Sequence, residues 1–208
     1  MAKKHKLYFS VDVEAAGRTP GKYSMLSFGA CIVGNTDIQF YRELQPISSN
    51  YQKEAMKIGC LGLKCLEPLK HIPEFNPKSR YFMPKRALTV LEAKGTHPHQ
   101  AMLEFADWII ENSENYRPIL AAAPIKFDGM FISWYFDNFY SKEDPFRHGG
   151  EDINSLYRGA RNNLYAHISD LKIRNEGLNH NGLDDAIQQA KEMEFVLDMI
   201  KNNFKIVE

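Results

Sequence analysis

The stretch LYFSVDVEAAG, residues 7–17, constrains the fold more than any other part of the chain. A short apolar run ends in two carboxylates, Asp12 and Glu14, with Val13 between them. Alternate residues of a β-strand point to the same face of the sheet, so both acids are expected to project side by side. Two buried anions that close repel each other unless a positive charge compensates them, and Mg²⁺ prefers carboxylate oxygen. An edge strand with two solvated acids is the alternative.

Size and composition indicate one soluble globular domain. Its 208 residues suffice for one sizeable core, with 44% hydrophobic and 25% charged residues. The formal net charge is zero, so a surface that binds nucleic acid must be local. The three cysteines lack metal-binding spacing, and the basic start MAKKHK runs into Asp12 without the apolar core of a signal peptide. With no apolar run long enough to cross a membrane, we expect a cytoplasmic protein.

The order of predicted elements is that of an α/β protein. Residues 6–13, 25–33 and 38–44 have the length and pattern of strands, and their spacing predicts an antiparallel meander. A helix is expected at 100–111, a short buried strand at 118–123, and a helix directly after it at 127–140. Residues 141–150 are expected to form a polar loop. A short helix should follow from 151, and a long helix at 183–204 should pack one apolar face on the core.

Between residues 59 and 99 the periodicity is weak and five prolines occur. We expect a loop-rich insert with short helices there, within a single domain at 1–208. From residue 46 to 100, nine Lys or Arg stand against four Asp or Glu, a local excess of +5. Tyr81 and Phe82 lie beside Arg80, Lys85 and Arg86, and aromatic rings among cations suit single-stranded nucleic acid. A solvated surface segment is the alternative.

Two further regions carry candidate catalytic or metal-binding residues. Asp128 falls in the first turn of the helix that follows the buried strand, where a carboxylate also complements the helix dipole. The stretch NHNGLDDAIQQA opens the last helix, and in one helix its His180 and Asp185 would lie about 140° apart. His180 is therefore expected in the preceding loop, with Gly182 allowing the bend and Asp185 in the first turn. Asp184, about 100° away around the helix, is expected to face solvent.

The ordered set DVE, FDGMF and HNGLDDA resembles the DEDDh exonucleases, the 3′–5′ exonucleases related to the proofreading subunit of bacterial DNA polymerase III, RNase T and oligoribonuclease. The resemblance covers most of the chain. It implies a ribonuclease-H-like fold, a mixed sheet of about five strands flanked by helices. The chain departs from the family pattern at Ala15, Ala16, Pro124 and Gly182, and these departures leave the acids and the histidine intact.

The same resemblance implies two-metal hydrolysis of a terminal phosphodiester with release of nucleoside 5′-monophosphates. Asp12, Glu14 and Asp185 would hold one Mg²⁺ ion. Asp12 would bridge to a second ion supported by Asp128, and Mn²⁺ would substitute for Mg²⁺. His180 would be the general base, since an unperturbed imidazole titrates near pH 6.5, roughly where such a base is needed.

Substrate contacts are expected at Ala15 and Met25, which would line the pocket for the terminal nucleotide. Arg80, Lys85 and Arg86 would guide the strand behind it. The expected partner is nucleic acid with a single-stranded 3′ end, and the resemblance also allows a homodimer. A non-catalytic nucleic-acid-binding protein and a ribonuclease-H-like endonuclease are the alternatives. The filled site positions count against the first, and the histidine motif counts against the second. The sequence alone does not distinguish between DNA and RNA as the substrate.

Overall fold

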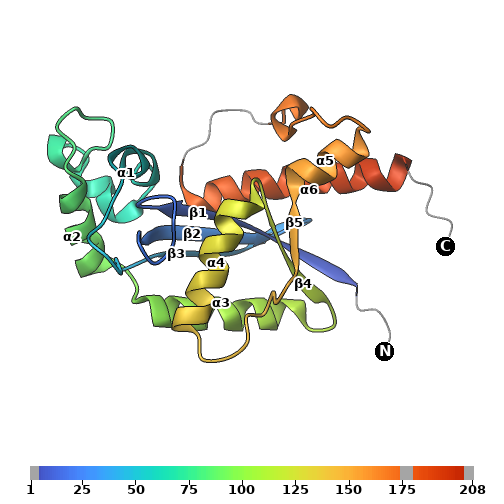
Figure 1. Ribbon diagram of the computed structural model, residues 1–208, viewed down its shortest axis with the longest axis horizontal. Coiled ribbons are helices and arrows are strands. Elements are labelled where there is room, and N and C mark those ends of the chain that lie inside the picture. Colours follow the sequence, from blue (N-terminus) through green and yellow to red (C-terminus); the bar gives the residue numbers. More distant parts are fainter. Residues whose placement is uncertain (1–4, 174–179, 204–208) are drawn as a thin grey trace.

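A computed structural model describes residues 5–173 and 180–203, and its centre is one five-stranded sheet (Figure 1). The strand order is β3-β2-β1-β4-β5, with antiparallel pairing among the first three and parallel pairing of β4 with β1 and with β5. This mixed sheet confirms the predicted architecture. The strands are β1 (Lys6–Ala15), β2 (Met25–Ile32), β3 (Asn35–Glu43), β4 (Arg117–Ala122) and β5 (Gly150–Asp152).

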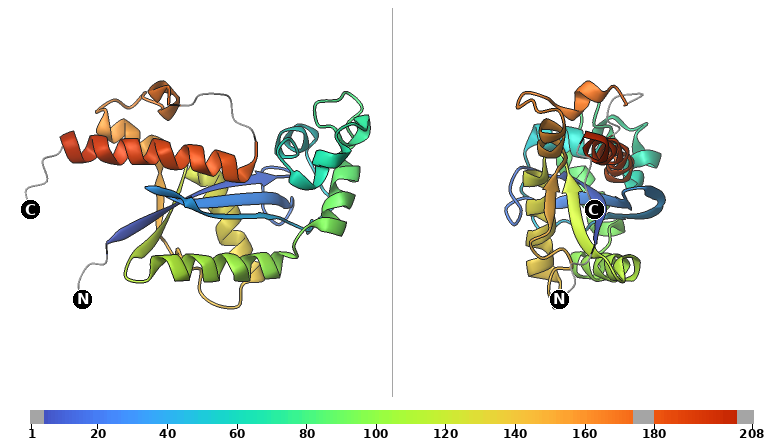
Figure 2. Two further views of the ribbon diagram at one scale, coloured as in Figure 1. Left: turned by 180° about the vertical axis from the view of Figure 1, so that it is seen from behind. Right: turned by 90° about the vertical axis from the view of Figure 1, so that its right-hand side faces the viewer.

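Helices cover both faces of the sheet, as the two views of Figure 2 show. The pattern along β1 explains why, because alternate side chains point to opposite faces. Phe9, Val11 and Val13 pack into a core shared with α3 and α4, whereas Tyr8 packs with α5 and α6. The helices are α1 (Lys53–Gly59), α2 (Pro84–Lys94), α3 (Pro98–Ser113), α4 (Ile125–Phe139), α5 (Ile153–Ala160) and α6 (Gly182–Asn203).

The first turn of α6 lies directly on the sheet, without side chains between the two backbones. A Cβ at Gly29 on β2 would lie 2.3 Å from the Cα of Leu183. A Cβ at Gly182 would lie 2.9 Å from the backbone nitrogen of Gly29 and 3.0 Å from the carbonyl oxygen of Asp12. Ser10 on β1 adds a hydrogen bond from its hydroxyl to the Ala186 carbonyl, at 2.7 Å. These contacts set the position of α6 relative to β1.

The segment from 59 to 99 contains the short helices that were expected, although its weak periodicity did not predict their bounds. Two 3₁₀ helices, Lys64–Leu69 and Pro73–Phe75, precede the eleven-residue α2. α2 begins with Pro84, whose fixed φ suits a first helical turn. The apolar side chains that α2 buries after this first turn are too few to give a clear periodic signal. They are Ala87, Leu88 and Leu91, which pack in one cluster with Leu26, Met56 and Leu63.

Other boundaries also differ from the sequence expectation. β5 lies within and just after the expected polar loop, because a three-residue strand is too short to show alternation. The helix expected from 151 begins at Ile153, since the Asp152 side chain accepts a hydrogen bond from the Ser155 backbone and caps it. α3 starts at Pro98 rather than at 100, again with proline in its first turn. Within the described residues, no helix combines the length and hydrophobicity needed to cross a membrane.

Candidate active site

β1 carries the first two acids beyond the end of its pairing with β4. The parallel β1–β4 ladder ends at Ser10 and Ala121, so the stretch from Asp12 to Ala15 pairs only with β2. Asp12 is half-buried and Glu14 is buried, and both lie on the face of β1 that α6 covers. The predicted side-by-side projection of the two acids is thus compatible with their register on β1.

Asp128, in the first turn of α4, bonds to β1 where β4 has diverged. Its Oδ1 accepts a hydrogen bond from the backbone nitrogen of Val13 at 2.9 Å, between the two acids of β1. The carboxylate therefore takes the place of a missing strand partner. Asp128 is 4% exposed, and burial raises its pKa to about 7, with the nearby Glu14 charge acting in the same direction.

The entrance to α6 brings the histidine and the last aspartate to Glu14. His180 lies before the helix with φ 51°, and Asp185 is 4% exposed whereas Asp184 is exposed, as predicted. Glu14, His180 and Asp185 each offer a ligand atom, and these atoms all lie within 4.8 Å of one another. His180 Nδ1 is 3.7 Å from Glu14 Oε1. This cluster joins residues from the two ends of the described chain.

Burial and mutual charge govern this cluster. Burial raises the pKa of Glu14, and the facing His180 partly offsets that rise. The same contact with Glu14 raises the pKa of His180 above its ordinary value. Glu14, Asp128 and Asp185 are each less than one-tenth exposed, and their charges repel one another. A set of buried carboxylate oxygens beside an imidazole has the chemistry to hold a hard divalent cation.

Asp12 joins the site through a residue that the sequence analysis did not select. Its Oδ1 accepts a hydrogen bond from Gln189 Nε2 at 2.8 Å, and Gln189 Oε1 accepts one from the Ala123 backbone at 2.8 Å. The 4.8 Å cluster includes neither Asp12 nor Asp128. Asp12 lies on β1 two residues before Glu14, and Asp128 accepts its hydrogen bond from the Val13 backbone between them. No motif marks Gln189, although it lies one helical turn after Asp185.

The insert contacts the histidine loop directly. The Gly62 backbone nitrogen donates to the His180 carbonyl at 3.1 Å, and Asn181 Nδ2 donates to the Gly62 carbonyl at 2.7 Å. A Cβ at Gly59 would lie 3.3 Å from Glu14 Oε2. Gly59 and Gly62 thus form part of the wall of the site. A glycine in an irregular segment gives no signal by which sequence analysis could have found this.

Ala15 and Met25, the residues expected to line the terminal nucleotide pocket, are both buried. They pair with each other across β1 and β2, and the Met25 backbone nitrogen donates to the Tyr135 hydroxyl at 2.8 Å. Both belong to the core cluster beneath α4. Their contact with substrate stays a prediction.

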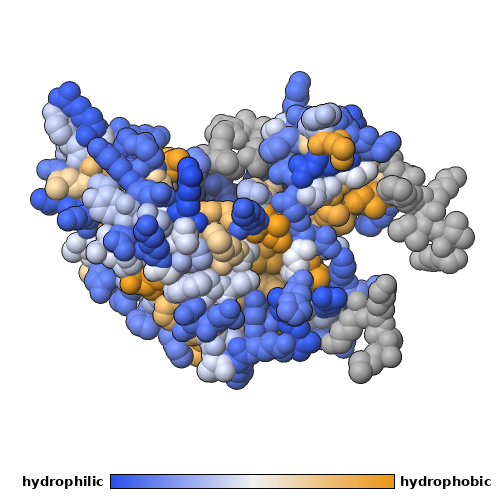
Figure 3. Space-filling view, in the orientation of Figure 1, coloured by the Kyte–Doolittle hydropathy of each residue, from blue (hydrophilic) through white to orange (hydrophobic). Residues whose placement is uncertain are grey.

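The predicted cationic residues lie on the insert surface. Arg80, Lys85 and Arg86 are exposed, and the Arg80 guanidinium lies 4.6 Å from the centre of the exposed Tyr81 ring. Phe82, in contrast, is 5% exposed and packs in the core below α2, so its ring is not offered to a base. Figure 3 shows mainly hydrophilic side chains over this end of the molecule, where α1 and α2 lie.

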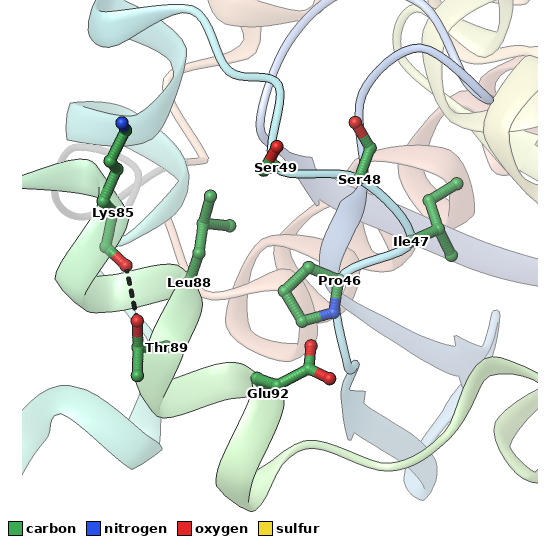
Figure 4. Close-up of a pocket in the computed structure, with 8 residues that line it drawn as sticks. All are labelled: Pro46, Ile47, Ser48, Ser49, Lys85, Leu88, Thr89 and Glu92. Carbon is green, nitrogen blue, oxygen red and sulfur yellow. Dashed lines mark hydrogen bonds between the residues drawn. The ribbon is translucent and has the colours of Figure 1, made fainter.

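A cavity of about 540 Å³ opens between α2 and the chain after β3 (Figure 4). Lys85 stands on one wall, and Ser48 and Ser49 stand on the other. Ser24, next to Met25, holds this second wall by accepting from the Ile47 and Ser48 backbone nitrogens. The cavity therefore adjoins the end of the sheet that carries the acids. It is lined by Pro46, Ile47, Ser48, Ser49, Lys85, Leu88, Thr89 and Glu92.

Solved structures identify the class of fold. The nuclease domain of 3′hExo, a DEDDh family member bound to rAMP, superimposes with a TM-score of 0.61 at 13% identity, over 98% of this chain and 95% of that one. Escherichia coli ExoI in complex with single-stranded DNA gives 0.56 at 14% identity, over 98% of this chain but only 42% of that one. A 3′-exonuclease that recognises the histone mRNA stem-loop gives 0.63 at 13% identity, over 93% and 64%. The fold is that of the ribonuclease-H-like exonucleases.

Sequence comparison is more specific. No model of a protein family matches the chain. A curated protein, the 3′–5′ DNA exonuclease Cap18 of Escherichia coli, is 33% identical over 162 residues, which cover 76% of this chain and 72% of that protein. The chain belongs to the DEDDh family of 3′–5′ exonucleases. It is therefore an enzyme rather than a non-catalytic binding protein, and the family implies dependence on a divalent metal ion.

Proposed function

We propose that this enzyme removes nucleotides from the 3′ end of single-stranded DNA by hydrolysing the terminal phosphodiester, with release of nucleoside 5′-monophosphates. The observation that carries the proposal is the cluster of Glu14, His180 and Asp185, whose ligand atoms lie within 4.8 Å of one another. DNA is chosen over RNA because the curated relative is named a DNA exonuclease. A cytoplasmic location and a homodimer stay predictions from the sequence.

In this proposal, Glu14 and Asp185 hold one Mg²⁺ ion together with Asp12, and Asp12 and Asp128 hold a second. The ions, when bound, supply an activated water and stabilise the leaving oxygen. The four carboxylates come from β1, α4 and α6, so their positions depend on the packing of those elements. Support comes from the donor set itself, because buried carboxylates that repel one another are stabilised by a cation.

His180 acts in the proposal as the general base. Its side chain is 31% exposed, so one edge of the imidazole is open to the water that attacks. Glu14 lies on its Nδ1 side at 3.7 Å and favours the protonated form that results from proton transfer. The backbone of His180, held by Gly62, fixes the loop that presents the ring.

Digestion of end-labelled oligonucleotides tests the function. With a 5′ label on single-stranded DNA, a ladder that shortens from the 3′ end is expected with Mg²⁺ or Mn²⁺ and is abolished by EDTA. Matched single-stranded RNA, duplex DNA and dinucleotides in parallel determine the substrate class. Internal cuts would instead support an endonuclease, and faster digestion of RNA than DNA would overturn the choice of substrate.

The role of His180 is tested separately from metal binding. His180→Ala should lower turnover by roughly 10²- to 10⁴-fold, the range expected for loss of a general base. Calorimetric titration with Mn²⁺ should give an affinity close to that of the unsubstituted protein. A large loss of Mn²⁺ affinity would show that His180 is a metal ligand. This control is needed because His180 lies among the carboxylates.

A further inference from the structure

Gln189 occupies the gap that opens where β1 and β4 diverge. It lies four residues, about one helical turn, after Asp185 on α6, and its side chain is 4% exposed. One end of its amide meets Asp12 and the other meets the backbone of Ala123, each at 2.8 Å. A single buried side chain thus joins α6 to β1 and to the end of β4.

The chemistry of the two partners fixes the orientation of this amide. The Ala123 backbone N–H is a donor, so it must meet Oε1. The Asp12 carboxylate, when ionised, only accepts, so it must meet Nε2. Rotation of the amide by 180° would place Nε2 against the Ala123 N–H, donor against donor, and Oε1 against the Asp12 carboxylate, acceptor against acceptor. The hydrogen bond to Oδ1 in turn restricts rotation of the Asp12 carboxylate.

We propose that Gln189 is a positioning residue that holds the Asp12 carboxylate in the orientation needed to bind metal. The inference rests on the proposed function, in which Asp12 is a metal ligand. Groups that hydrogen-bond to metal ligands orient them, and their loss typically costs about 10- to 100-fold in metal affinity or activity. Gln189 itself is buried, and the low dielectric around its amide strengthens the hydrogen bond that it donates.

A purely structural role is the competing explanation, since Gln189 also satisfies the Ala123 backbone. The two explanations differ in what they predict for metal affinity. Loss of the Ala123 hydrogen bond lowers the stability of the fold but does not alter how tightly a folded molecule binds metal. Loss of the Asp12 hydrogen bond weakens metal binding in molecules that remain folded.

The chain offers a matched control at the preceding residue. Gln188 is also a glutamine on α6, but it is only partly buried, and its Nε2 donates to Glu192 at 3.3 Å rather than to β1. Gln189→Met and Gln188→Met therefore make the same chemical change one residue apart. Circular dichroism and thermal unfolding of the metal-free proteins establish which variants are folded at the temperature of the titration.

Calorimetric titration with Mn²⁺ of the full chain then tests the inference. Gln189→Met should bind Mn²⁺ about 10- to 100-fold more weakly, whereas Gln188→Met should match the unsubstituted protein. Unchanged Mn²⁺ affinity in folded Gln189→Met, even with lower thermal stability, would overturn the inference. If Gln189→Met does not fold, Gln189→Asn replaces it, since its shorter amide keeps a polar group in the gap but does not span both partners.

Asp12→Asn separates failure of this inference from failure of the proposed function. If the unsubstituted protein binds no Mn²⁺, or if Asp12→Asn binds it equally well, the proposed metal site is wrong. If Asp12→Asn weakens binding and folded Gln189→Met does not, the metal site stands and only the role of Gln189 is rejected. Weakening in both variants, with Gln188→Met unchanged, supports the inference.

Discussion

Asp184 and Asp185 are neighbours in the sequence but occupy opposite environments, since one is exposed and the other is buried beside Glu14 and His180. Asp185→Asn is expected to lower exonuclease turnover by at least about two orders of magnitude, because a proposed metal ligand is lost. Asp184→Asn should leave turnover within about twofold, as for most exposed surface changes. Rates on a 5′-labelled oligonucleotide with Mg²⁺ measure both. The reverse result would mean that the register of the last motif is shifted by one residue.

Asp144, in the loop before β5, should make stability depend on pH. Burial raises its pKa to about 6, and the nearby acids Asp137 and Glu143 act in the same direction. A carboxyl whose pKa is raised on folding favours the folded state when protonated. Its contribution is therefore fully present below about pH 4 and is lost as the pH rises through about 6.

Asp144→Asn should consequently raise the melting temperature at pH 8 by a few degrees and change it little at pH 4. The asparagine oxygen can still accept the hydrogen bond that Asp144 accepts from the Phe146 backbone at 2.8 Å. Thermal unfolding at both pH values measures the effect, with Glu143→Gln on the exposed neighbour as the control. An equal rise at both pH values would point to a packing effect instead of titration.

The sequence was sufficient to predict candidate site residues that belong to recognisable motifs. Asp12, Glu14, Asp128, His180 and Asp185 were predicted because DVE, FDGMF and HNGLDDA occur in the order that resembles the DEDDh exonucleases, although no one of these motifs is specific by itself. Gln189 was not predicted, since a glutamine within an amphipathic helix is ordinary and its two partners are distant in the sequence. Its contact becomes visible only when α6 is placed on the gap between β1 and β4.

At the scale of elements, the contact between the insert and the histidine loop leaves no room for a side chain. A Cβ at Gly62 would lie 2.3 Å from the His180 carbonyl oxygen and 2.6 Å from the Asn181 Cα. Gly62→Ala must therefore shift the loop that presents His180. We expect turnover to fall by about tenfold or more, because small misplacements of a catalytic group are costly.

Gly159→Ala in α5 is the matched control for Gly62→Ala. Nothing lies within 4 Å of a Cβ at Gly159, and alanine in a helix is about 0.5–1 kcal/mol more favourable than glycine. That variant should keep full turnover and melt slightly higher. The turnover and melting temperature of both variants, measured side by side, test whether the insert positions the histidine loop. Full activity in Gly62→Ala would show that the insert does not position the histidine loop.

Most strands and helices were predicted close to their observed bounds, whereas β5 and the extent of α2 were not. β1 and β2 are apolar runs of strand length, and α4 and α6 repeat apolar residues at helical spacing, so their bounds differ from the predicted ones by only a few residues. β5 has three residues, and α2 buries a short stripe after a run of prolines. Their structure depends on the neighbours against which they pack, which a single sequence does not reveal.

At the scale of the whole molecule, a neutral chain that gathers acids at one site needs positive charge elsewhere to hold a polyanion. The exposed Lys85 and Arg86 lie in the first turn of α2, which packs with α1 in one apolar cluster. Lys85→Glu with Arg86→Glu should raise KM on oligonucleotides. Loss of two phosphate contacts should also flatten the log–log salt dependence of binding by about 1.4, at roughly 0.7 for each contact to a single strand.

A small substrate separates this effect from damage to the site. The p-nitrophenyl ester of thymidine 5′-monophosphate is too short to reach the insert surface, so its hydrolysis should be unchanged in the double variant. Lys142→Glu with Lys201→Glu makes the same change of charge at two other exposed positions and should not alter KM. Equal loss on both substrates would indicate misfolding, and no loss on either would leave the insert as a solvated surface.

The hydrogen bond between Gln189 and Asp12 joins residues 177 positions apart, and Asp185 likewise comes late in the chain. At roughly 5–20 residues per second, a ribosome makes the acids of β1 about 9–35 s before it makes the partner of Asp12. Until residue 180 is made, a nascent chain therefore carries at most three of the four proposed site acids and lacks the histidine of the site. Under the proposed function, exonuclease activity requires α6 to dock on β1, so a nascent chain without α6 is expected to be inactive toward nucleic acid.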